Sequence, residues 1–438
     1  MSQTKRNLKG ASQVLGVITF CSLLVSRTAA DLGSSRLESR EILLGRIGEE
    51  VLPDTVVASA DCRRIAYVVE KDAEGMRVMV DGQPVNLKVK AIREKPLFSP
   101  DSKRVAWISD HGDGFSVVVG GAEGRKSYRS IGEACLSFSP DSQRFAFIAG
   151  PNANRVAVVV DGVEGKSYEG VGNNNVRWSP DSRHFAYCAG KSRNHWTVVK
   201  DGEEFGKFDR VTVAMVFSPD GGRLAFVIGR DGKQIVVVDR EEGRPYDLIL
   251  EGGPIFSPDS QRVVYFGRRD GKDYLVVNGV EHNEYDAMLR GGPVFSADGK
   301  RLAYGVRQGT KRMLIADGLG PKEYSWDLGF PVFSPDSKRL AFYLEENFNT
   351  TIVLDGVKGN SYSEVGTGLQ FSPDSKHCAY WARRGSKWMV VADGQESNLN
   401  YEGFLPGGPL AFDGTKMLRG AGLRNKQVFR VEVEIREP

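Results

Sequence analysis

An eleven-residue motif recurs along this sequence at nearly constant spacing. It is clearest at Phe98, where it reads FSPDSKRVAWI. Similar segments begin at Phe138, Trp178, Phe217, Phe256, Phe295, Phe333 and Phe371. Weaker copies begin at Ala58 (ASADCRRIAYV) and Leu410 (LAFDGTKMLRG), so there are ten copies, 38 to 40 residues apart. A period of this length indicates a chain built by stacking one supersecondary unit.

The positions of the motif have distinct structural roles. The S-P-D-S/G core predicts a turn, because Pro presets φ and Asp accepts hydrogen bonds from nearby backbone. The Asp is present in all ten copies, as Asp61, Asp101, Asp141, Asp181, Asp220, Asp259, Asp298, Asp336, Asp374 and Asp413. After the turn, apolar, small and aromatic residues alternate as in a strand, for example Val105, Ala106 and Trp107. Such a strand is packed on both faces, as in the stacked blades of a propeller.

Each repeat also carries three further strands. A β-run, an Asp-Gly pair and a second β-run follow the motif, as at 156–168 around Asp161 and Gly162. This pattern is the strongest short-range signal for a hairpin. A short linker, often Gly-Gly-Pro, then leads into the strand that ends at the motif Phe. We therefore predict an all-β protein, a β-propeller of ten four-stranded repeats of about 39 residues.

The two ends of the repeat array are complementary. The last repeat ends after its third strand, 427–435, whereas the segment 41–48 (EILLGRIG) resembles a fourth strand. We expect the N-terminal strand to complete the last blade, which would remove an exposed edge. The propeller is assigned to 41–438 and a linker to 31–40. One ten-bladed ring fits the shared blade best, but two five-bladed rings and an open superhelical array stay as alternatives, because propellers usually have four to eight blades.

The first thirty residues have the features of a secretory signal peptide. Lys5, Arg6 and Lys9 precede a twelve-residue, mostly apolar run, and small residues lead up to a cleavage position after Ala30. The apolar run is shorter than the roughly 20 residues that span a bilayer. We therefore expect an exported protein, periplasmic or secreted, that is not transmembrane once the signal is removed.

Charge and cysteine content narrow the partners further. The first thirty residues contain four basic and no acidic side chains, which leaves 55 basic against 56 acidic residues in the remainder. This balance gives no basis for nucleic acid binding. Cys62, Cys135, Cys188 and Cys378 fall in separate repeats without a CxxC motif, and we expect buried free thiols.

The quoted motifs resemble the WD-repeat-like "PD" repeats of TolB-type β-propellers, which also occur in propeller domains of prolyl-oligopeptidase-like enzymes. The resemblance covers nearly the whole chain after residue 40. It implies that the strand before the SPD turn lies innermost, and that the first strand closes the last blade. It does not specify a function, because such propellers serve many roles.

The sequence contains no recognisable catalytic or metal-binding constellation. A catalytic carboxylate pair is needed once, whereas the turn Asp occurs ten times, so we interpret it as structural. His184 and His377 occupy the basic position of the motif, and His111, His195 and His282 lie in different repeats without metal-ligand spacing. There is no GxSxG motif. We therefore expect no enzyme activity, no metal and no cofactor.

Basic residues gather in the loops between the second and third strands, which emerge on one face of the ring. The candidate binding residues on this face are Arg193, His195, Trp196, Arg230, Arg268, Arg269, Arg307, Arg312, Arg383 and Arg384. The basic run is interrupted in the blade that contains Glu345 and Glu346. We hypothesise that this face binds a protein partner or an anionic envelope component. The alternative is that these are ordinary solvated loop residues.

A second group of candidates interrupts the inner-strand pattern. Asn174, Asn175, Arg177 and Gln370 stand where other copies have Gly, Pro or apolar residues, and they are candidates for the mouth of the central channel. The function predicted from the sequence is an extracytoplasmic, monomeric binding scaffold. The alternative is a propeller enzyme acting on a carbohydrate or lactone at the channel, which unpaired acids with perturbed pKa values would favour.

Overall fold

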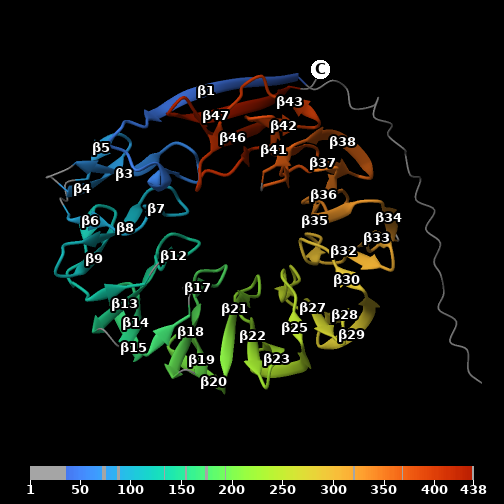
Figure 1. Ribbon diagram of the computed structural model, residues 1–438, viewed down its shortest axis with the longest axis horizontal. Helices are drawn as coiled ribbons and strands as arrows, with labels where there is room; N and C mark the ends of the chain where they lie inside the picture. The colour runs from blue at the N-terminus through green and yellow to red at the C-terminus, as the bar shows by residue number, and fades with distance from the viewer. Residues whose placement is uncertain are drawn as a thin grey trace, which may run out of the picture.

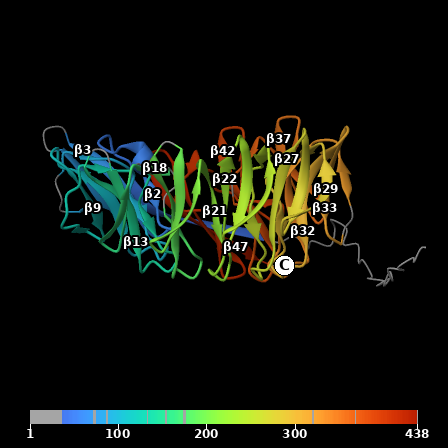
Figure 2. The same ribbon diagram turned by 90° about the horizontal axis from the view of Figure 1, so that it is seen from below.

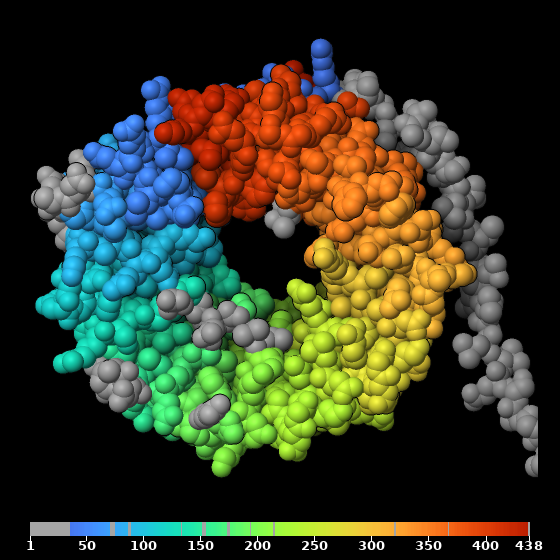
Figure 3. All heavy atoms as spheres, in the orientation of Figure 1, coloured from blue at the N-terminus to red at the C-terminus, as the bar shows by residue number. Residues whose placement is uncertain are grey.

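Ten antiparallel sheets form one closed ring around an open channel in the computed structural model (Figures 1 and 3). The structure describes residues 36–71, 75–85, 89–132, 134–152, 155–172, 176–192, 194–318, 321–366 and 368–436. The predicted signal peptide lies outside these residues. The ring is flat when it is seen from the side (Figure 2). The prediction of an all-β, ten-bladed propeller in a single ring is confirmed.

The blades are numbered in chain order. Blades 1 to 9 span 57–84, 91–123, 130–168, 170–208, 210–246, 248–285, 287–324, 327–362 and 364–396, and blade 10 combines 36–46 with 403–436. Blade 6 is typical, with β25 (Leu248–Ile249) and β26 (Ile255–Phe256) innermost, followed by β27 (Val263–Arg269), β28 (Lys272–Val277) and β29 (Val280–Tyr285). Blade 8 has β35 (Asp327–Phe333), β36 (Leu340–Glu346), β37 (Asn349–Leu354) and β38 (Val357–Tyr362). In blades 1 to 9 the order of the strands from the channel outward therefore follows the chain.

The SPD turn is held by a side-chain network that explains its sequence. Ser99 Oγ donates to Asp101 Oδ1 at 2.6 Å and accepts from the backbone N–H of Arg104 at 2.9 Å. Ser102 adopts a left-handed φ of 63°, which accounts for the Ser or Gly at this position. Its counterpart in the next blade, Ser142, accepts from the backbone N–H of Asp101 at 2.9 Å. The turn therefore both closes its own hairpin and contacts its neighbour.

The basic residue of the motif bonds one blade to the next. Arg339 Nε donates to Asp355 at the hairpin turn of blade 8, at 2.8 Å, and Nη1 donates to the carbonyls of Ser375 and Lys376 in blade 9. The guanidinium also lies over the ring of Phe371, 5.5 Å from its centre. Arg64, Arg144 and Arg223 make equivalent contacts. The repeated Arg and the Asp of the Asp-Gly turn are thus partners.

The core lies between neighbouring blades. The small residue of the motif is completely buried in nine blades, at Ala66, Ala106, Ala146, Ala186, Ala225, Val264, Ala303, Ala341 and Ala379. The aromatic residue of the motif makes an edge-to-face contact with the Tyr that ends the outer strand of the preceding blade. In the pair Tyr246 and Tyr265 the ring centroids are 6.1 Å apart. The prediction that the second strand is buried on both faces is confirmed.

Blade 10 closes the ring with strands from both ends of the chain. β1 (Arg36–Arg46) pairs antiparallel with β47 (Gln427–Arg436), which pairs with β46 (Met417–Arg424); β44 (Gly403–Phe404) and β45 (Ala411–Asp413) lie innermost. The predicted closure is confirmed. The strand begins at Arg36 instead of Glu41, so 36–40 belongs to the strand and not to a linker.

The tenth copy of the motif is shifted relative to the other nine. Phe412 pairs with Leu418 as Phe98 pairs with Val105 in blade 2, which places Asp413 at the position of the turn Ser. Asp413 ends β45 and forms an ion pair with Arg419. The prediction that Asp413 is the tenth turn Asp is therefore corrected: a shorter turn moves it into the strand.

The shift also places charge inside the closing blade. Arg419 pairs with Ala411 and so occupies the small position that Ala106 holds in blade 2. Glu432, only 1% exposed, forms ion pairs with Arg40, Arg419 and Arg430. Cys62 of blade 1 lies across this interface, with Sγ 4.0 Å from the carbonyl of Pro409. The closing interface is thus partly ionic.

The cysteines of the described residues are free thiols, as predicted. Cys62, Cys135 and Cys378 are buried and Cys188 is half-buried. Burial raises the pKa of Cys62 to about 12. None of the helical segments in the described part of the chain is long and apolar enough to cross a membrane.

Candidate functional site

Six arginines of the predicted basic face have intramolecular acidic partners. Arg230, Arg269 and Arg384 form two-pronged pairs with Glu242, Glu281 and Glu396, each twelve residues further along the chain, at 2.6 to 3.2 Å. Arg268 pairs with the fully buried Asp273, Arg312 with Asp327 and Arg383 with Glu364, at 2.5 to 2.7 Å. The loops are basic in sequence, but the face that carries these pairs is largely neutral.

These pairs also join neighbouring blades. Glu281 of blade 6 accepts a hydrogen bond from Tyr246 Oη of blade 5 at 2.8 Å, and the guanidinium of Arg269 lies over the Tyr246 ring. The hydrogen bonds from Arg269 hold the pKa of Glu281 below its usual value. Tyr362 with Glu396 and Arg384 repeats this arrangement at blades 8 and 9. The arginines therefore have a packing role that the sequence analysis missed.

The remaining predicted site residues do not converge. Trp196 packs against Gly190, where a Cβ atom would lie 3.2 Å from the indole, and His195 beside it is half-buried in β19 (His195–Lys200). Arg307 is exposed at the end of β32 (Leu302–Gln308). Arg193, Asn174 and Asn175 lie outside the described residues.

The two described channel-mouth candidates lie on opposite sides of the ring. Arg177 is exposed on the innermost strand of blade 4, β17 (Arg177–Trp178). Gln370 lies in β40 (Gln370–Phe371) of blade 9, and its Nε2 donates to the carbonyl of Leu410 in blade 10. The structure thus gives Gln370 a role in joining two blades and does not bring the predicted residues together.

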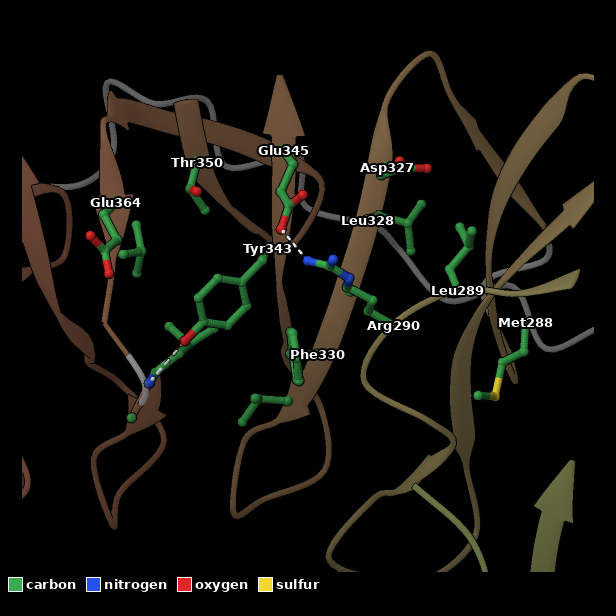
Figure 4. Close-up of a pocket in the computed structure, with 15 residues that line it drawn as sticks. Met288, Leu289, Arg290, Asp327, Leu328, Phe330, Tyr343, Glu345, Thr350 and Glu364 are labelled. Atoms are coloured by element: carbon green, nitrogen blue, oxygen red, sulfur yellow. Dashed lines mark hydrogen bonds and ion pairs between the residues drawn. The ribbon is translucent and has the colours of Figure 1, made fainter. Parts of the chain in front are cut away.

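A pocket of about 620 Å³ opens instead between blades 7, 8 and 9 (Figure 4). Its apolar lining includes Leu289, Leu328, Val365 and Leu369. The β36–β37 hairpin contributes Glu345 and Thr350, and the linkers within blades 7 and 9 contribute Arg290 and Gly368. Both kinds of segment therefore lie on one face of the ring. A further cavity of about 710 Å³ lies between blades 1, 2 and 3, and its lining includes Ala134, which is also left-handed (φ 46°) but carries no aromatic ring.

Tyr343 fixes the floor of this pocket. Its hydroxyl donates to the carbonyl of Gly366 at 3.2 Å and accepts from the backbone N–H of Leu369 at 3.4 Å, so a side chain of blade 8 holds the linker of blade 9 (Figure 4). Burial raises the pKa of Tyr343. The Tyr343 hydroxyl is therefore already hydrogen-bonded within the protein, so this residue lines the pocket with its aromatic ring.

Phe330 stands beside Tyr343 at a position where the linkers of blades 7 and 9 have the left-handed glycines Gly292 and Gly368. The linker of blade 8 reads Gly-Phe-Pro where that of blade 7 reads Gly291-Gly292-Pro293, and both Phe330 (φ 50°) and Gly292 (φ 63°) are left-handed. The Phe330 ring is 5.7 Å from that of Tyr343, nearly perpendicular to it, and the residue is 51% exposed. A left-handed residue with a side chain costs about 1–2 kcal/mol, and this one leaves its ring half in solvent.

Phe348 makes the same departure at the tip of the β36–β37 hairpin. Two-residue turns of this kind need positive φ at both positions, which favours Gly at the second. Blades 5 and 6 have Asp231-Gly232 and Asp270-Gly271 there, whereas blade 8 has Asn347 (φ 50°) and Phe348 (φ 62°). Phe348 is completely exposed. We call Phe330, Phe348 and the pocket between blades 7 and 9 the blade 8 patch.

Charges around the blade 8 patch occur in opposite pairs. Arg290 lies 3.6 Å from Glu345, and both are well exposed (Figure 4). Asp327 pairs with Arg312, Glu364 with Arg383 and Glu346 with Lys358. Four acidic groups thus face four basic ones. The sequence analysis noticed the acidic interruption in this blade but not the two phenylalanines, whose significance depends on their backbone conformation.

Comparison with known proteins shows similarity of fold only. No known protein family and no curated protein sequence matches the chain. Among solved structures, a eukaryotic initiation factor is similar with a TM-score of 0.46 and 15% identity, over 79% of this chain and 99% of that one. TolB from Acinetobacter baumannii is similar with a TM-score of 0.26 and 20% identity, over 61% of this chain and 67% of that one. The Cps50 (Swd1) β-propeller domain of Myceliophteria thermophila is similar with a TM-score of 0.28 and 12% identity, over 59% of this chain and 95% of that one.

Proposed function

We propose that this protein is an extracytoplasmic, non-catalytic binding propeller that docks a protein partner on the blade 8 patch. The observation that carries the proposal is the pair of exposed phenylalanines in left-handed positions: blades 7 and 9 have a left-handed glycine at the position of Phe330, and blades 5 and 6 have one at the position of Phe348. Both lie in one blade, and the pocket is lined by Phe330 itself and by the stem of the hairpin that carries Phe348.

Energetics favour a covered state of this patch. Each left-handed phenylalanine costs about 1–2 kcal/mol in the free protein; the Phe348 ring makes up for none of this cost because it is completely exposed, and the Phe330 ring offsets part of it by its contact with Tyr343. Burying a phenylalanine side chain at an interface gains roughly 1.5–3 kcal/mol. Aromatic anchors at the centre of an interface commonly dominate its binding energy. The strain and the exposure are thus both accounted for by a partner.

The titratable groups support a non-catalytic role. Among the described residues, each carboxyl group with a shifted pKa has it lowered, most often by hydrogen bonds from its neighbours, as in Asp101, Glu204 and Asp247. A general acid at neutral pH needs a raised carboxyl pKa. No group of three or more potential metal ligands is arranged around one point in the described part of the chain.

Export is supported by the sequence of the first thirty residues, which has the charge, length and cleavage pattern of a secretory signal. A basic face that attracts an anionic component is less well supported than the apolar patch, because the arginines in question are paired with Glu242, Glu281, Glu364 and Glu396. The partner is therefore expected to recognise apolar surface.

Site-specific photo-crosslinking tests the proposal. A photo-reactive amino acid at position 350, which lines the pocket, is expected to capture a discrete protein from cell-envelope extract. The matched control is position 163, an exposed apolar residue on the outer strand of blade 3. Phe330→Gly introduces the residue of the linkers in blades 7 and 9 and should abolish capture without loss of thermal stability. Equal capture at both positions, or capture that survives Phe330→Gly, would refute the proposal.

A further inference from the structure

We propose that the occupant of the blade 8 patch is a second copy of this chain, with Phe348 of each ring inserted into the pocket of the other. This inference rests on the proposed function and names the partner. It starts from a single relationship: Phe348, which we call the anchor, and the pocket belong to the same small surface. Glu345 and Thr350, which line the pocket, flank the turn that carries Phe348.

Such a surface is complementary to itself. In a two-fold contact the same patch is used by both subunits, so residue i meets residue j and residue j meets residue i. A two-fold axis between the hairpin tip and the pocket places each Phe348 over the pocket of the other ring. A different partner would need both a pocket for Phe348 and a group to fill the 620 Å³ cavity. A second copy supplies both.

The charges of the patch fit a second copy better than a charged partner. The four acidic groups near the pocket are matched by Arg290, Arg312, Arg383 and Lys358. A strongly charged protein gains nothing from a neutral patch, and two identical neutral patches do not repel each other. Like-charge juxtaposition would otherwise cost several kcal/mol at an interface.

The receiving pocket is suited to an aromatic ring. Its volume of about 620 Å³ falls within the roughly 300–1,000 Å³ of typical binding pockets. Leu289, Leu328 and Leu369 supply apolar walls, and the Phe330 ring already stands edge to face against Tyr343. A third ring can join this pair in the offset or edge-to-face geometry that aromatic groups prefer. A contact of this kind closes after two copies, so it gives dimers and not fibres.

Analytical ultracentrifugation of the chain without residues 1–30 tests the inference. The wild-type protein is expected to pass from monomer to dimer with rising concentration. Phe348→Asn removes the anchor and suits a left-handed turn, and it should raise the dimer dissociation constant at least tenfold while the melting temperature is maintained or rises. Val163→Asn, which removes an exposed apolar side chain from the outer strand of blade 3, should leave the dissociation constant unchanged.

A mixing experiment separates docking from general stickiness. Thr350→Arg fills the pocket but keeps Phe348, whereas Phe348→Asn keeps the pocket but lacks the anchor. Each variant alone should be monomeric. Their equimolar mixture should form dimers, because one of the two anchor–pocket contacts is restored. The inference would be overturned if each variant alone still formed dimers as the wild-type protein does, or if the mixture of the two variants formed none.

The outcomes for this inference and for the proposed function differ. A wild-type protein that is monomeric at every concentration overturns the second copy as occupant. If position 350 then still captures a different envelope protein in a manner that depends on Phe330, the binding function stands with another partner. If position 350 captures nothing, both are wrong. A crosslinked species of twice the chain mass would support both.

Discussion

The guanidinium of Arg339 donates a hydrogen bond to the main-chain carbonyl of Lys376 at 2.6 Å, so a side chain of blade 8 is bonded to the turn of blade 9. The same group holds Asp355 in its own blade and lies over Phe371 in the next. One side chain thus carries out three repeated functions of the motif. The ring is stabilised less by any single blade than by contacts of this kind between blades.

Replacing this arginine should therefore loosen the junction between two blades. Arg339→Gln removes the charge-assisted hydrogen bonds, each worth about 1.5–3 kcal/mol when fully formed, and is expected to lower the midpoint of thermal unfolding by several degrees. The matched control is Arg262→Gln. Arg262 also lies over a ring of the next blade, Phe295, but its hairpin turn carries Asn278 in place of Asp. An equal effect of both substitutions would contradict the proposed role of the Asp partner.

The buried Glu432 should be essential to the closing blade. Glu432→Gln removes the ion pair that Arg430 makes with this carboxylate and leaves Arg419 with Asp413 alone, and losing one partner of a buried ion pair costs about 3–5 kcal/mol. We expect a marked fall in the urea concentration at which the protein unfolds. Glu434→Gln, on the same strand with its side chain 44% exposed, should have little effect. Similar effects for both variants would show that Glu432 contributes no more than a surface pair.

Acid should destabilise the ring through the SPD turns. The Ser99 hydroxyl and the Lys103 amide lower the pKa of Asp101 by donating to its carboxylate, and the corresponding pKa is lowered in the eight other intact turns. A carboxyl with a lowered folded pKa stabilises the protein above the unfolded value of about 3.9, and this stabilisation is lost as the pH falls through the folded pKa.

The melting temperature is therefore expected to be nearly constant between about pH 5 and 7 and to fall steeply below about pH 4. Ser99→Ala should make Asp101 titrate at a higher pH, and it should lower the melting temperature at neutral pH more than at pH 3. A melting temperature that does not change between pH 7 and pH 3 would contradict the role assigned to these turns.

A charge reversal at a loop arginine should be compensated by a second reversal at its acidic partner in the same chain. Arg384→Glu places like charges next to Glu396 and is expected to lower stability by about 1 kcal/mol, the scale of an exposed pair. Adding Glu396→Arg restores an opposite pair and should recover most of the loss. Equilibrium unfolding in urea measures both variants. If the single reversal leaves stability unchanged, the pair does not hold the blades, and an external partner for these arginines becomes the better explanation.

Most of the fold could be predicted from the repeat pattern of the sequence. The turn Ser and Asp, the small and aromatic positions and the completion of blade 10 by an N-terminal strand were all predicted, because each follows from local chemistry repeated many times. The strand register of the last copy of the motif was not predicted correctly. Leu410 to Asp413 resembles the motif in letters, but strand pairing places Phe412 at the position of Phe98.

The candidate site was harder to predict for two physical reasons. The neutrality of the basic loops depends on side chains twelve residues apart that meet only after a strand and a turn have folded, as with Arg269 and Glu281. The unusual character of Phe330 and Phe348 lies in their left-handed backbone, which the identity of the residue does not reveal. An alignment places Phe330 opposite Gly292 and Gly368 and Phe348 opposite Gly232 and Gly271, but other blades have non-glycine residues there, such as Lys95 and Lys426.

The closing blade sets an order of events for this chain in the cell. β1 is synthesised before every other described strand, and its only sheet partner, β47, is about 390 residues away and is made after all the others. Contacts between such distant segments form late in folding. Until the final strands have emerged, the nine complete blades are an open arc with unprotected edges, and β1 is a single strand with exposed backbone groups. The closed ring can therefore form only after the whole chain has been made, when β47 covers the edge of blade 10 and pairs with β1.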